Sequence, residues 1–573
     1  MTNTPERPQP WVCKGTRSSP HEEIENWGDK CSYPGCSNVR NGNGPSGPPV
    51  NRKKILIGGG AVIVFALGAV LLIKSVTGDN QPSNPASNQA SNPTSNQPSN
   101  PTSNQPSNPT SNQVSNQASN QASNQASNPT SNQPSNPTSN QPSNQPSNQP
   151  PSDLSSGEEV FLGRGTSNTD RDRGVEAFRA GNYGDAIKFF NKAIYNDRKD
   201  PEAQIFLNNA KARLNGNPIL LATVVPIDNR EGAAREMLRG VADAQTQFND
   251  VGGVGNRLVE IVIANDSNDE QQATTIAQKL ASNQNILGVV GHNSSGPTKS
   301  ALPEYEKADL GLISPTSTST SISSPIFFRT TPSDTSAGKK LADYTYNNKW
   351  NNRFIDNIAI FYNPSSPYSK SLEKAFSTHF KQLGGKVFAS IDISSPNFNP
   401  QRQISEIRGK VEAIALFPNT NLISVAMGII KANTEVTGQK FLMVGGDALY
   451  TGETIFNGGV AANNLVLAVP WFSGGQDYAI QAQKRWQGTV NWRTATSFDA
   501  TLALVNALST NPTRQSVIQN LKSTNLPSSQ TSGNPIKFTI QGEVKLEPII
   551  VRIAKGVPKR PGGSDYGFEL ISK

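Results

Sequence analysis

The chain has 573 residues, of which 34% are hydrophobic, and its formal net charge is +8. Eight basic and five acidic residues precede residue 55, and the rest of the excess is spread thinly over the remaining chain, so the charge predicts no nucleic-acid-binding surface. The length exceeds that of one ordinary domain. Composition shifts divide the chain into five predicted segments: 1–54, 55–74, 75–152, 153–216 and 217–573.

The first segment is polar, is rich in Pro, Gly and Asn, and contains every cysteine. Cys13, His21, Cys31 and Cys36 offer the donor types of a tetrahedral zinc site, and a reducing compartment would keep the thiols available. Their spacing contains neither a C-x2-C pair nor a close His pair. Two hypotheses therefore stay open, a zinc site and three ordinary thiols in an unstructured tail.

Ile55–Ile73 is a run of nineteen uncharged residues, close to the roughly 20 that a transmembrane helix needs. The competing interpretation, a signal peptide, would have a shorter apolar region nearer the start. Three basic residues precede the run and only Lys74 follows it, which predicts a cytoplasmic N-terminus. The sequence thus predicts a single-pass signal anchor with the large domain on the periplasmic side.

Residues 80–152 contain no charged or aromatic residue and, apart from Val114, consist of Ser, Asn, Gln, Pro, Thr and Ala. Such a segment has too little to bury to offset its ordering entropy, which predicts a disordered linker. It is either a stalk that lifts the next part away from the membrane or low-complexity sequence without a selected length.

Residues 153–216 resemble one tetratricopeptide repeat followed by a further helix, with small and aromatic residues where two antiparallel helices approach closely. Because such arrays normally need about three repeats for independent stability, we expect this segment to pack against its neighbour. A structural adaptor is favoured over a peptide-binding array.

From Pro218 onward, apolar strands alternate with amphipathic helices, which is typical of parallel sheets with helices on both faces. Two successive runs of this kind predict an α/β fold with two lobes, each a doubly wound parallel sheet, joined by a hinge. Without cysteines, this domain depends on its hydrophobic core, and we expect it to need no cofactor. The predicted strands are 219–227, 258–266, 286–292, 310–315, 357–363, 413–419, 440–447 and 464–471.

Two neighbouring strands end in hydroxyl clusters, "VVGHNSSG" and "LGLISPTSTST", at the rim where such sheets bind ligands. Hydroxyls and free backbone N–H groups at a helix N-terminus favour a carboxylate. Ser295 and Thr318 are therefore the candidate carboxylate-binding residues. A strand of the second run ends in "VGGDAL", where Asp447 is either an acid facing the rim or a helix N-cap. An anion site facing a carboxylate is what a zwitterion requires.

Residues 218 to about 557 resemble extracellular ligand-binding proteins of the leucine/isoleucine/valine-binding type, which have the type I periplasmic-binding fold. The motifs that carry the resemblance are "VVGHNSSG", "PEYEKADLGLISPTSTS", "FFRTTPSD", "FYNPSSPYSKS", "LGGKV", "VGGDAL" and "SFDATLALVNAL".

The resemblance implies a role for each matching residue. Ser295 and Thr318 would bind the ligand carboxylate, the carbonyl of Ser317 and the side chain of Asp447 would bind the ammonium, and Tyr368 would close over the ligand. The first rim loop departs from the family, because Arg230 and Glu231 stand where many relatives have small or hydroxyl residues. This departure leaves room for a polar or charged ligand.

The resemblance implies a substrate-binding component that delivers an amino acid or similar zwitterion to an ABC permease. The alternative is a sensor or scaffold whose closure is read by a signalling partner. An enzyme is not expected, because His292 beside Ser294 and Ser295 is the only pairing of a base with a nucleophile, and no acid is placed to orient it.

Overall fold

The computed structural model describes residues 11–13, 24–26, 152–164, 168–438, 441–557 and 565–572. The chain divides into two compact units, Met1–Asn136 and Pro137–Lys573. The first unit is described only in strands β1 (Trp11–Cys13) and β2 (Ile24–Asn26), which pair antiparallel with Cys13 opposite Ile24. All other described elements belong to the second unit.

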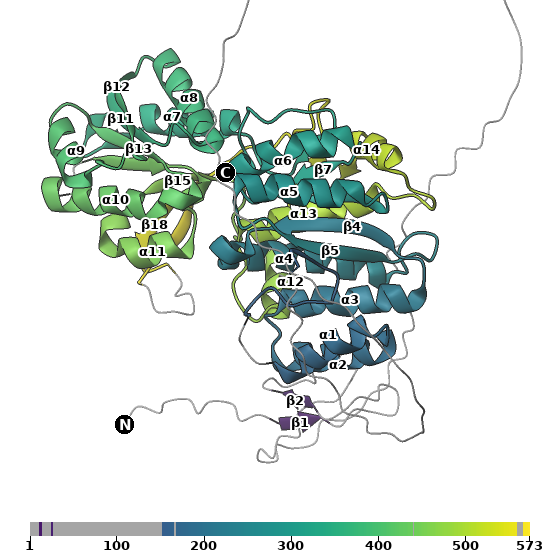
Figure 1. Ribbon diagram of the computed structural model, residues 1–573. Coiled ribbons are helices and arrows are strands. Elements are labelled where there is room, and N and C mark those ends of the chain that lie inside the picture. Colours follow the sequence, from purple (N-terminus) through teal and green to yellow (C-terminus); the bar gives the residue numbers. More distant parts are fainter. Residues whose placement is uncertain are drawn as a thin grey trace, which may run out of the picture. The chain divides into compact units, whose positions relative to one another are not determined.

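A six-stranded sheet forms the first lobe of the second unit (Figure 1). Its central strands are apolar runs that are buried almost throughout, as in parallel sheets covered on both faces. The strand order is β3-β5-β4-β6-β7-β8. The strands are β3 (Leu154–Ser155), β4 (Ile219–Val225), β5 (Val259–Asn265), β6 (Ile286–Val290), β7 (Leu312–Ser314) and β8 (Phe327–Arg329).

Helices cover both faces of this sheet, because right-handed crossovers leave β4 and β5 in opposite directions along the strand order. This places α4 on one face, packed along α13, and places α5 and α6 together on the other. The helices are α4 (Ile227–Asp250), α5 (Glu270–Ser282), α6 (Ser295–Lys307), α12 (Asp477–Arg485), α13 (Trp492–Asn506) and α14 (Arg514–Lys522); a small ladder pairs β16 (Asn525–Leu526) with β17 (Ile536–Lys537).

The second lobe has a seven-stranded sheet in the order β12-β11-β13-β14-β15-β18-β19. Its strands are β11 (Asn357–Tyr362), β12 (Lys386–Asp392), β13 (Ala413–Phe417), β14 (Leu442–Gly445), β15 (Val466–Val469), β18 (Ile549–Lys555) and β19 (Tyr566–Ser572). Its helices are α7 (Asp334–Asn347), α8 (Pro367–Gln382), α9 (Pro400–Ile407), α10 (Ile423–Thr437) and α11 (Gly452–Gly458), with 3-10 turns η1 (Thr420–Leu422), η2 (Asp447–Leu449) and η3 (Gly459–Ala462); a short hairpin pairs β9 (Lys349–Trp350) with β10 (Arg353–Phe354).

The two predicted lobes are confirmed, but the prediction that both sheets are parallel is wrong. In lobe 1, β3 pairs antiparallel with β5. In lobe 2, β18 pairs antiparallel with β15 on one side and with β19 on the other. These strands come from the two ends of the alternating pattern, where no crossover helix is needed and an antiparallel strand can join a sheet edge.

Three helices occupy the segment in which a tetratricopeptide-like hairpin is expected: α1 (Thr169–Arg179), α2 (Tyr183–Asn196) and α3 (Pro201–Asn215). The α1–α2 approach is close at Gly174, where an added Cβ would lie 2.6 Å from the ring of Phe190. Helix α3 packs against α4 and β5, and Asn209 hydrogen-bonds both the N–H and the carbonyl of Ile261 in β5. The segment therefore packs against lobe 1 as expected, while its kinship to that repeat stays a prediction.

The chain crosses between the lobes three times, between β8 and α7, between β15 and α12, and between β17 and β18. Two of these crossings touch, because Arg329 forms a parallel bridge with Glu543 and an ion pair of 3.1 Å with its carboxylate. Adjacent crossings of this kind are where two lobes can rotate about a hinge.

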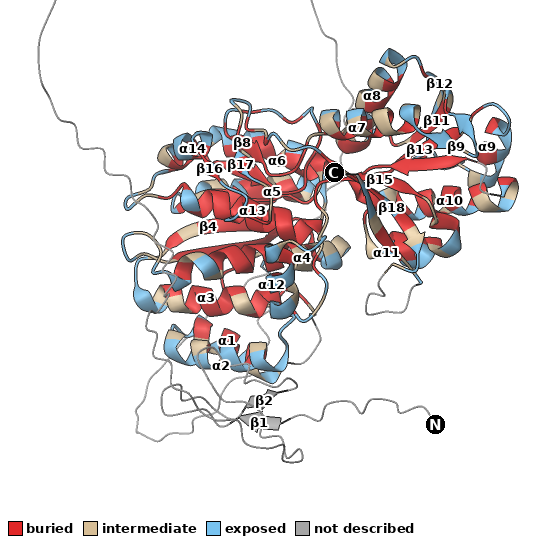
Figure 2. Cartoon of the chain, turned by 180° about the vertical axis from the view of Figure 1, so that it is seen from behind, coloured by how far each residue is buried: buried red, intermediate tan, exposed pale blue. Residues whose placement is uncertain are grey.

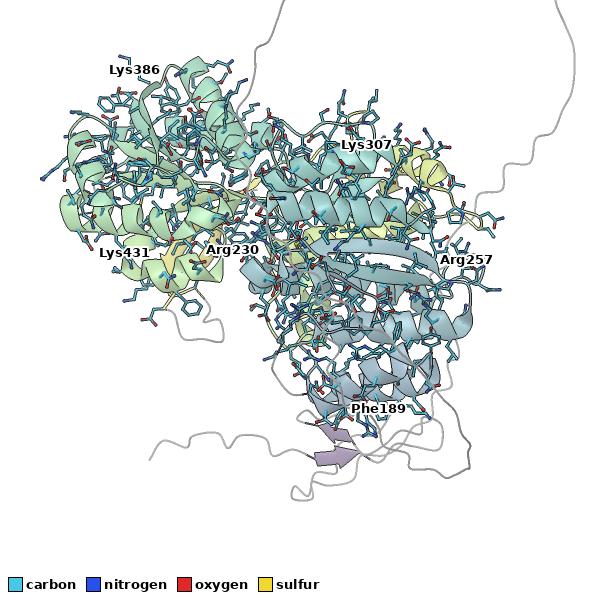
Figure 3. The ribbon with its side chains drawn as sticks, viewed as in Figure 1. Phe189, Arg230, Arg257, Lys307, Lys386 and Lys431 are labelled. Carbon is cyan, nitrogen blue, oxygen red and sulfur yellow. The ribbon has the colours of Figure 1, made fainter. Side chains whose placement is uncertain are left out.

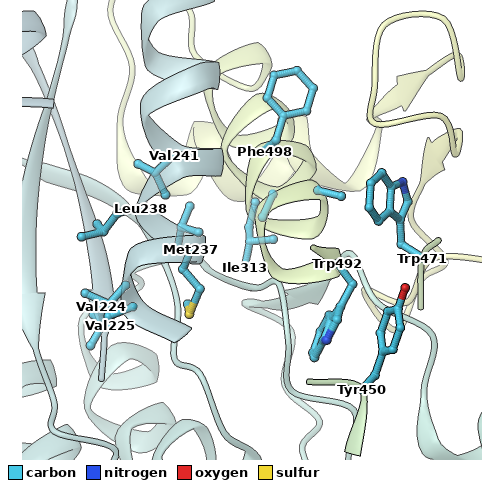
Figure 4. Packing of buried hydrophobic residues seen from close by; sticks show 14 of the residues in the cluster. Val224, Val225, Met237, Leu238, Val241, Ile313, Tyr450, Trp471, Trp492 and Phe498 are labelled. Atoms are coloured by element: carbon cyan, nitrogen blue, oxygen red, sulfur yellow. The ribbon is translucent and has the colours of Figure 1, made fainter. Parts of the chain in front are cut away.

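The interiors of both sheets are buried, whereas exposed residues line the outer helix faces (Figure 2). Figure 4 shows Met237, Leu238 and Val241 of α4 beside Val224 and Val225 of β4. This packing fixes the strand ends from which the rim loops depart. Among the described residues, no helix combines the length and apolar character needed to cross a bilayer; Ile55–Ile73 lies outside them.

Candidate functional site

A cavity of ≈ 410 Å³ lies between the lobes at the carboxyl ends of their parallel strands. Each lobe contributes loops that follow its strands, as the doubly wound topology requires. Lobe 1 lines the cavity with Asn268, Asp269, Glu270, Asn293, Ser294, Ser295, Gly296, Pro297, Thr316, Trp492 and Arg493, and lobe 2 with Asn363, Ser365, Ser366, Pro367, Tyr368, Asn419, Thr420, Asn421, Asp447 and Ala448.

Ser295 is the first residue of α6 and lines the cavity. Its side chain is buried, and its hydroxyl accepts a hydrogen bond of 3.3 Å from the N–H of Ser319. The preceding residue, Ser294, makes no side-chain capping hydrogen bond to the helix. The first turn of α6 therefore presents donors and the positive end of a helix dipole to the cavity, which suits an anion.

Ser317 and Thr318 are buried and do not line the cavity, whereas the neighbouring Thr316 does. The carbonyl of Ser317 already accepts a hydrogen bond of 3.0 Å from Nη1 of Arg329. A ligand ammonium at this carbonyl would thus share it with a guanidinium. The Oγ1 of Thr318 has no hydrogen-bond partner in the part of the chain that the structure describes.

Tyr368 and Asp447 come together in lobe 2, and both line the cavity. The Tyr368 hydroxyl donates a hydrogen bond of 2.8 Å to Oδ1 of Asp447 and accepts one of 3.3 Å from the N–H of Ala448. Burial raises the pKa of Asp447 above its ordinary value, while the hydrogen bond from Tyr368 and the charge of Arg493 lower it. Asp447 begins the turn η2 beside the cavity, so it is available to a ligand cation.

The structure adds Arg493 on α13, which sequence reasoning missed. It is 6% exposed, lines the cavity, and has its guanidinium carbon 4.4 Å from the ring centroid of Trp492. Burial lowers the pKa of Arg493 to about 10, against the opposite effects of Asp447 and Glu236. The available signal was a basic residue four positions before the motif "SFDATLALVNAL".

Asp334, in the quoted motif "FFRTTPSD", is a second residue that sequence reasoning missed. It begins α7 at the first lobe crossing and is 1% exposed. Among the described residues, neither carboxylate oxygen has a donor in hydrogen-bonding geometry. Burial raises the pKa of Asp334 to about 7; nearby Thr318 lowers it, and the charge of Asp447 raises it. A buried acid whose carboxylate has no well-formed hydrogen bond, and with the hydroxyls of Thr318 and Ser371 near enough to lower its pKa, is thus placed close to two predicted site residues.

Lobe 2 is held against lobe 1 around Thr420. Arg230 donates to the carbonyl of Thr420, and Figure 3 shows Arg230 on the side of lobe 1 that faces lobe 2. The Thr420 hydroxyl lies 3.4 Å from that of Ser294 and 3.5 Å from Nδ2 of Asn268. A second line of contact joins Thr320 to Ser371 at 3.0 Å. The lobes are therefore in direct contact at two places.

The expectation that no acid orients His292 is wrong. Its Nδ1 lies 2.7 Å from Oδ2 of Asp266, and its Nε2 lies 3.2 Å from the hydroxyl of Tyr305. Asp266 follows the end of β5, and only the folded sheet, in which β5 and β6 flank β4, brings Asp266 to His292. His292 is completely buried, and its neighbours Ser294 and Ser295 make no hydrogen bond to it in the described structure. The hydrogen bonds of His292 to Asp266 and Tyr305 therefore stabilise the rim loop.

The predicted zinc ligands fall largely outside the described residues. Cys13 is described only as the last residue of β1, and His21, Cys31 and Cys36 are not described. The described residues contain no cluster of metal-binding side chains. The zinc site stays a prediction.

A family model described as "Periplasmic binding protein" matches residues 230–546, more than half of the chain. The leucine-, isoleucine-, valine-, threonine- and alanine-binding protein of Pseudomonas aeruginosa is 27% identical over 200 residues, covering 33% of this chain and 51% of that protein. The Leu/Ile/Val-binding protein homolog 1 of Brucella abortus is 23% identical over 187 residues, covering 32% and 49%. The chain thus spans about half the length of these curated relatives.

Two solved structures show the same fold. A leucine-binding protein from Thermotoga maritima superposes with a TM-score of 0.53 at 17% identity, covering 62% of this chain and 98% of that one. A branched-chain amino acid transporter substrate-binding protein from Streptococcus pneumoniae, in complex with isoleucine, gives 0.53 at 18% identity, covering 62% and 100%. These relatives are solute-binding proteins rather than enzymes. The chain therefore belongs to the periplasmic binding protein family and has the two-lobed type I fold of its Leu/Ile/Val-binding ABC substrate-binding members.

Proposed function

We propose that this protein captures a small zwitterion, an amino acid or a close analogue, in the cavity between its lobes. The observation that carries the proposal is the pairing of opposite chemistries across the cavity. The first turn of α6 with Ser295 favours a carboxylate, and Asp447 with Tyr368 faces it from lobe 2 and favours an ammonium. A ligand that touches both lobes stabilises the closed arrangement by its extra contacts there.

The cavity lining argues against a purely branched-chain ligand. Five asparagines line it, and two pairs of them are hydrogen-bonded: Asn363 to Asn419 and Asn293 to Asn268, each at 3.1 Å. The apolar side chain of a bound ligand would cover these amides without hydrogen-bonding them, and each buried amide left without a partner costs free energy. A ligand with a polar side chain fits this surface better.

Capture is tested by thermal unfolding of the purified full-length chain against a panel of amino acids. A ligand present at 100 times its dissociation constant adds about 2.7 kcal/mol to the free energy of unfolding. We expect this gain to be lost in Asp447→Asn and reduced in Ser295→Ala, and to be kept in Ser394→Ala, a control on an exposed loop of lobe 2. The absence of a shift with every amino acid and zwitterion would refute the proposal.

We further propose that the protein serves uptake through an ABC permease and is tethered to the membrane by Ile55–Ile73, with the large domain in the periplasm. The names of the relatives support delivery to a transporter, and the apolar run supports the tether. Uptake of the identified ligand should fall in cells that lack the chain and should be restored by a version in which a cleavable signal peptide replaces the apolar run. If the cells respond to the ligand without taking it up, and do so only when the chain is anchored, the sensor alternative is favoured.

A further inference from the structure

Arg493 and its neighbour Trp492 present unused donors at the lobe 1 wall of the cavity. The Nε of Arg493 donates to Oδ1 of Asn293 at 3.3 Å, but neither of its terminal nitrogens has an acceptor among the described residues. The indole N–H of Trp492 is also buried without a described acceptor. Buried donors are nearly always satisfied in native proteins, so the indole N–H lacks an acceptor, while the terminal nitrogens of Arg493 are not among the buried unpartnered atoms and stay available at the cavity that Arg493 lines.

A second cation stands near Arg493. Arg230 interrupts the first turns of α4 with φ −147° and ψ 50°, and it lies close enough to Arg493 to lower the pKa of that residue. Two cations brought together in a poorly solvated wall repel each other unless an anion lies near them. Arg230 is held in this position by its hydrogen bond to Thr420 of lobe 2. Contact between the lobes therefore holds a second, half-buried positive charge near Arg493, although Arg230 itself does not line the cavity.

The protein supplies only part of the compensating negative charge. Glu236 is already committed, because it pairs with Arg239 at 2.6 Å and accepts a hydrogen bond of 2.5 Å from the hydroxyl of Thr494. Asp447 is the other acid that acts on Arg493. Once a ligand ammonium binds Asp447, that carboxylate is shared and the guanidinium lacks a full counter-ion.

The other acids that line the cavity do not supply the counter-ion that Arg493 lacks. Asp269 and Glu270 are exposed at the rim, where water screens them. The carboxylate of Asp269 caps α5 through the N–H groups of Gln271 and Gln272, and Glu270 accepts from Ser300. Neither forms an ion pair with Arg493 in the described structure.

Building on the solute-binding function proposed above, we propose that the ligand is an acidic amino acid whose side-chain carboxylate is bound by Arg493. Its α-carboxylate faces the first turn of α6, and its ammonium faces Asp447. The planar guanidinium can donate two parallel hydrogen bonds to a carboxylate, which makes an anionic side chain a better fit than an amide. Arg493 is thereby the residue that sets specificity.

The test is titration calorimetry of the full-length chain with L-glutamate, L-aspartate, L-glutamine, L-asparagine, L-leucine and L-lysine. A charge-assisted hydrogen bond predicts that an acidic ligand binds about 10- to 100-fold more tightly than its amide. In Arg493→Gln this preference should disappear, while the affinity for the amide changes little. Arg402→Gln, on the exposed surface of α9, is the matched control and should keep the parent's preference.

Each outcome decides between the two proposals. Equal or tighter binding of glutamine, leucine or lysine would overturn the acidic ligand and leave solute capture standing. No binding of any amino acid would overturn both. If Arg493→Gln does not fold, Arg493→Lys keeps the charge and should bind the acidic ligand more weakly, yet still prefer it to the amide; loss of the preference in a folded Arg493→Lys would refute the role of charge.

Discussion

The buried carboxyl of Asp334 makes the stability of the ligand-free protein depend on pH. Burial moves its pKa from 3.8 to about 7. At about 1.36 kcal/mol for each unit, ionising Asp334 in the folded protein above this pKa costs roughly 4 kcal/mol relative to the unfolded chain. Because the folded pKa lies above the unfolded one, the protonated acid supports the fold fully below about pH 4, and this support is lost as the pH rises to about 7.

Asp334→Asn places a neutral amide in the same volume and removes this pH dependence. The difference in unfolding free energy, variant minus parent, should grow in favour of the variant by about 2–3 kcal/mol between about pH 5 and about pH 8. The assay is urea unfolding of the ligand-free full-length chain, followed by tryptophan fluorescence, at both pH values. Subtracting the parent removes the contributions of the other titrating groups.

Asp499→Asn is the control for this prediction. Burial also raises the pKa of Asp499 to about 7, but its two carboxylate oxygens accept hydrogen bonds of 2.7 and 2.6 Å from the N–H and hydroxyl of Ser532. Above about pH 7 the ionised parent accepts both bonds, whereas an amide accepts only one of them, so Asp499→Asn should gain less stability over its parent between about pH 5 and about pH 8 than Asp334→Asn does. A difference between Asp334→Asn and the parent that does not change with pH would refute the description of Asp334 as a buried acid whose pKa is raised by burial.

Three further predictions follow from single contacts. Arg230→Ala removes a hydrogen bond between the lobes worth about 1–3 kcal/mol, so the ligand-free chain should open and its radius of gyration in small-angle scattering should rise; an unchanged radius would contradict this. Tyr368→Phe takes the donor at 2.8 Å away from Asp447, and ligand affinity measured by calorimetry should fall about 10-fold rather than stay constant. Gly240→Ala would set a Cβ 2.2 Å from a backbone oxygen of α13 and should cost about 1–3 kcal/mol in urea unfolding. The added Cβ of Gly232→Ala on the same helix meets nothing within 4 Å, and a comparable loss of unfolding free energy there would contradict this explanation.

Local pattern was enough to predict the parts of the site that sit at strand ends. Ser295 follows β6 because an apolar run must end where hydroxyls and glycine begin, and Asp447 follows β14 for the same reason. Alternating strands and helices also predicted two lobes, since amphipathic periodicity is a property of short windows of sequence. The antiparallel strands were missed because they lie outside the run of alternating strands and helices and carry no crossover signal.

The tertiary structure alone decided which distant residues meet. Arg493 hydrogen-bonds Asn293 across 200 positions of sequence, and Arg230 meets Thr420 across 190. Asp266 orients His292 only because β5 and β6 flank β4 in the same sheet. Burial and neighbouring charge, which set the pKa values of Asp334 and Arg493, are properties of the closed fold and leave no periodic trace in the chain. Sequence determined the scaffold and its rim, whereas the charges that choose a ligand were assembled by folding.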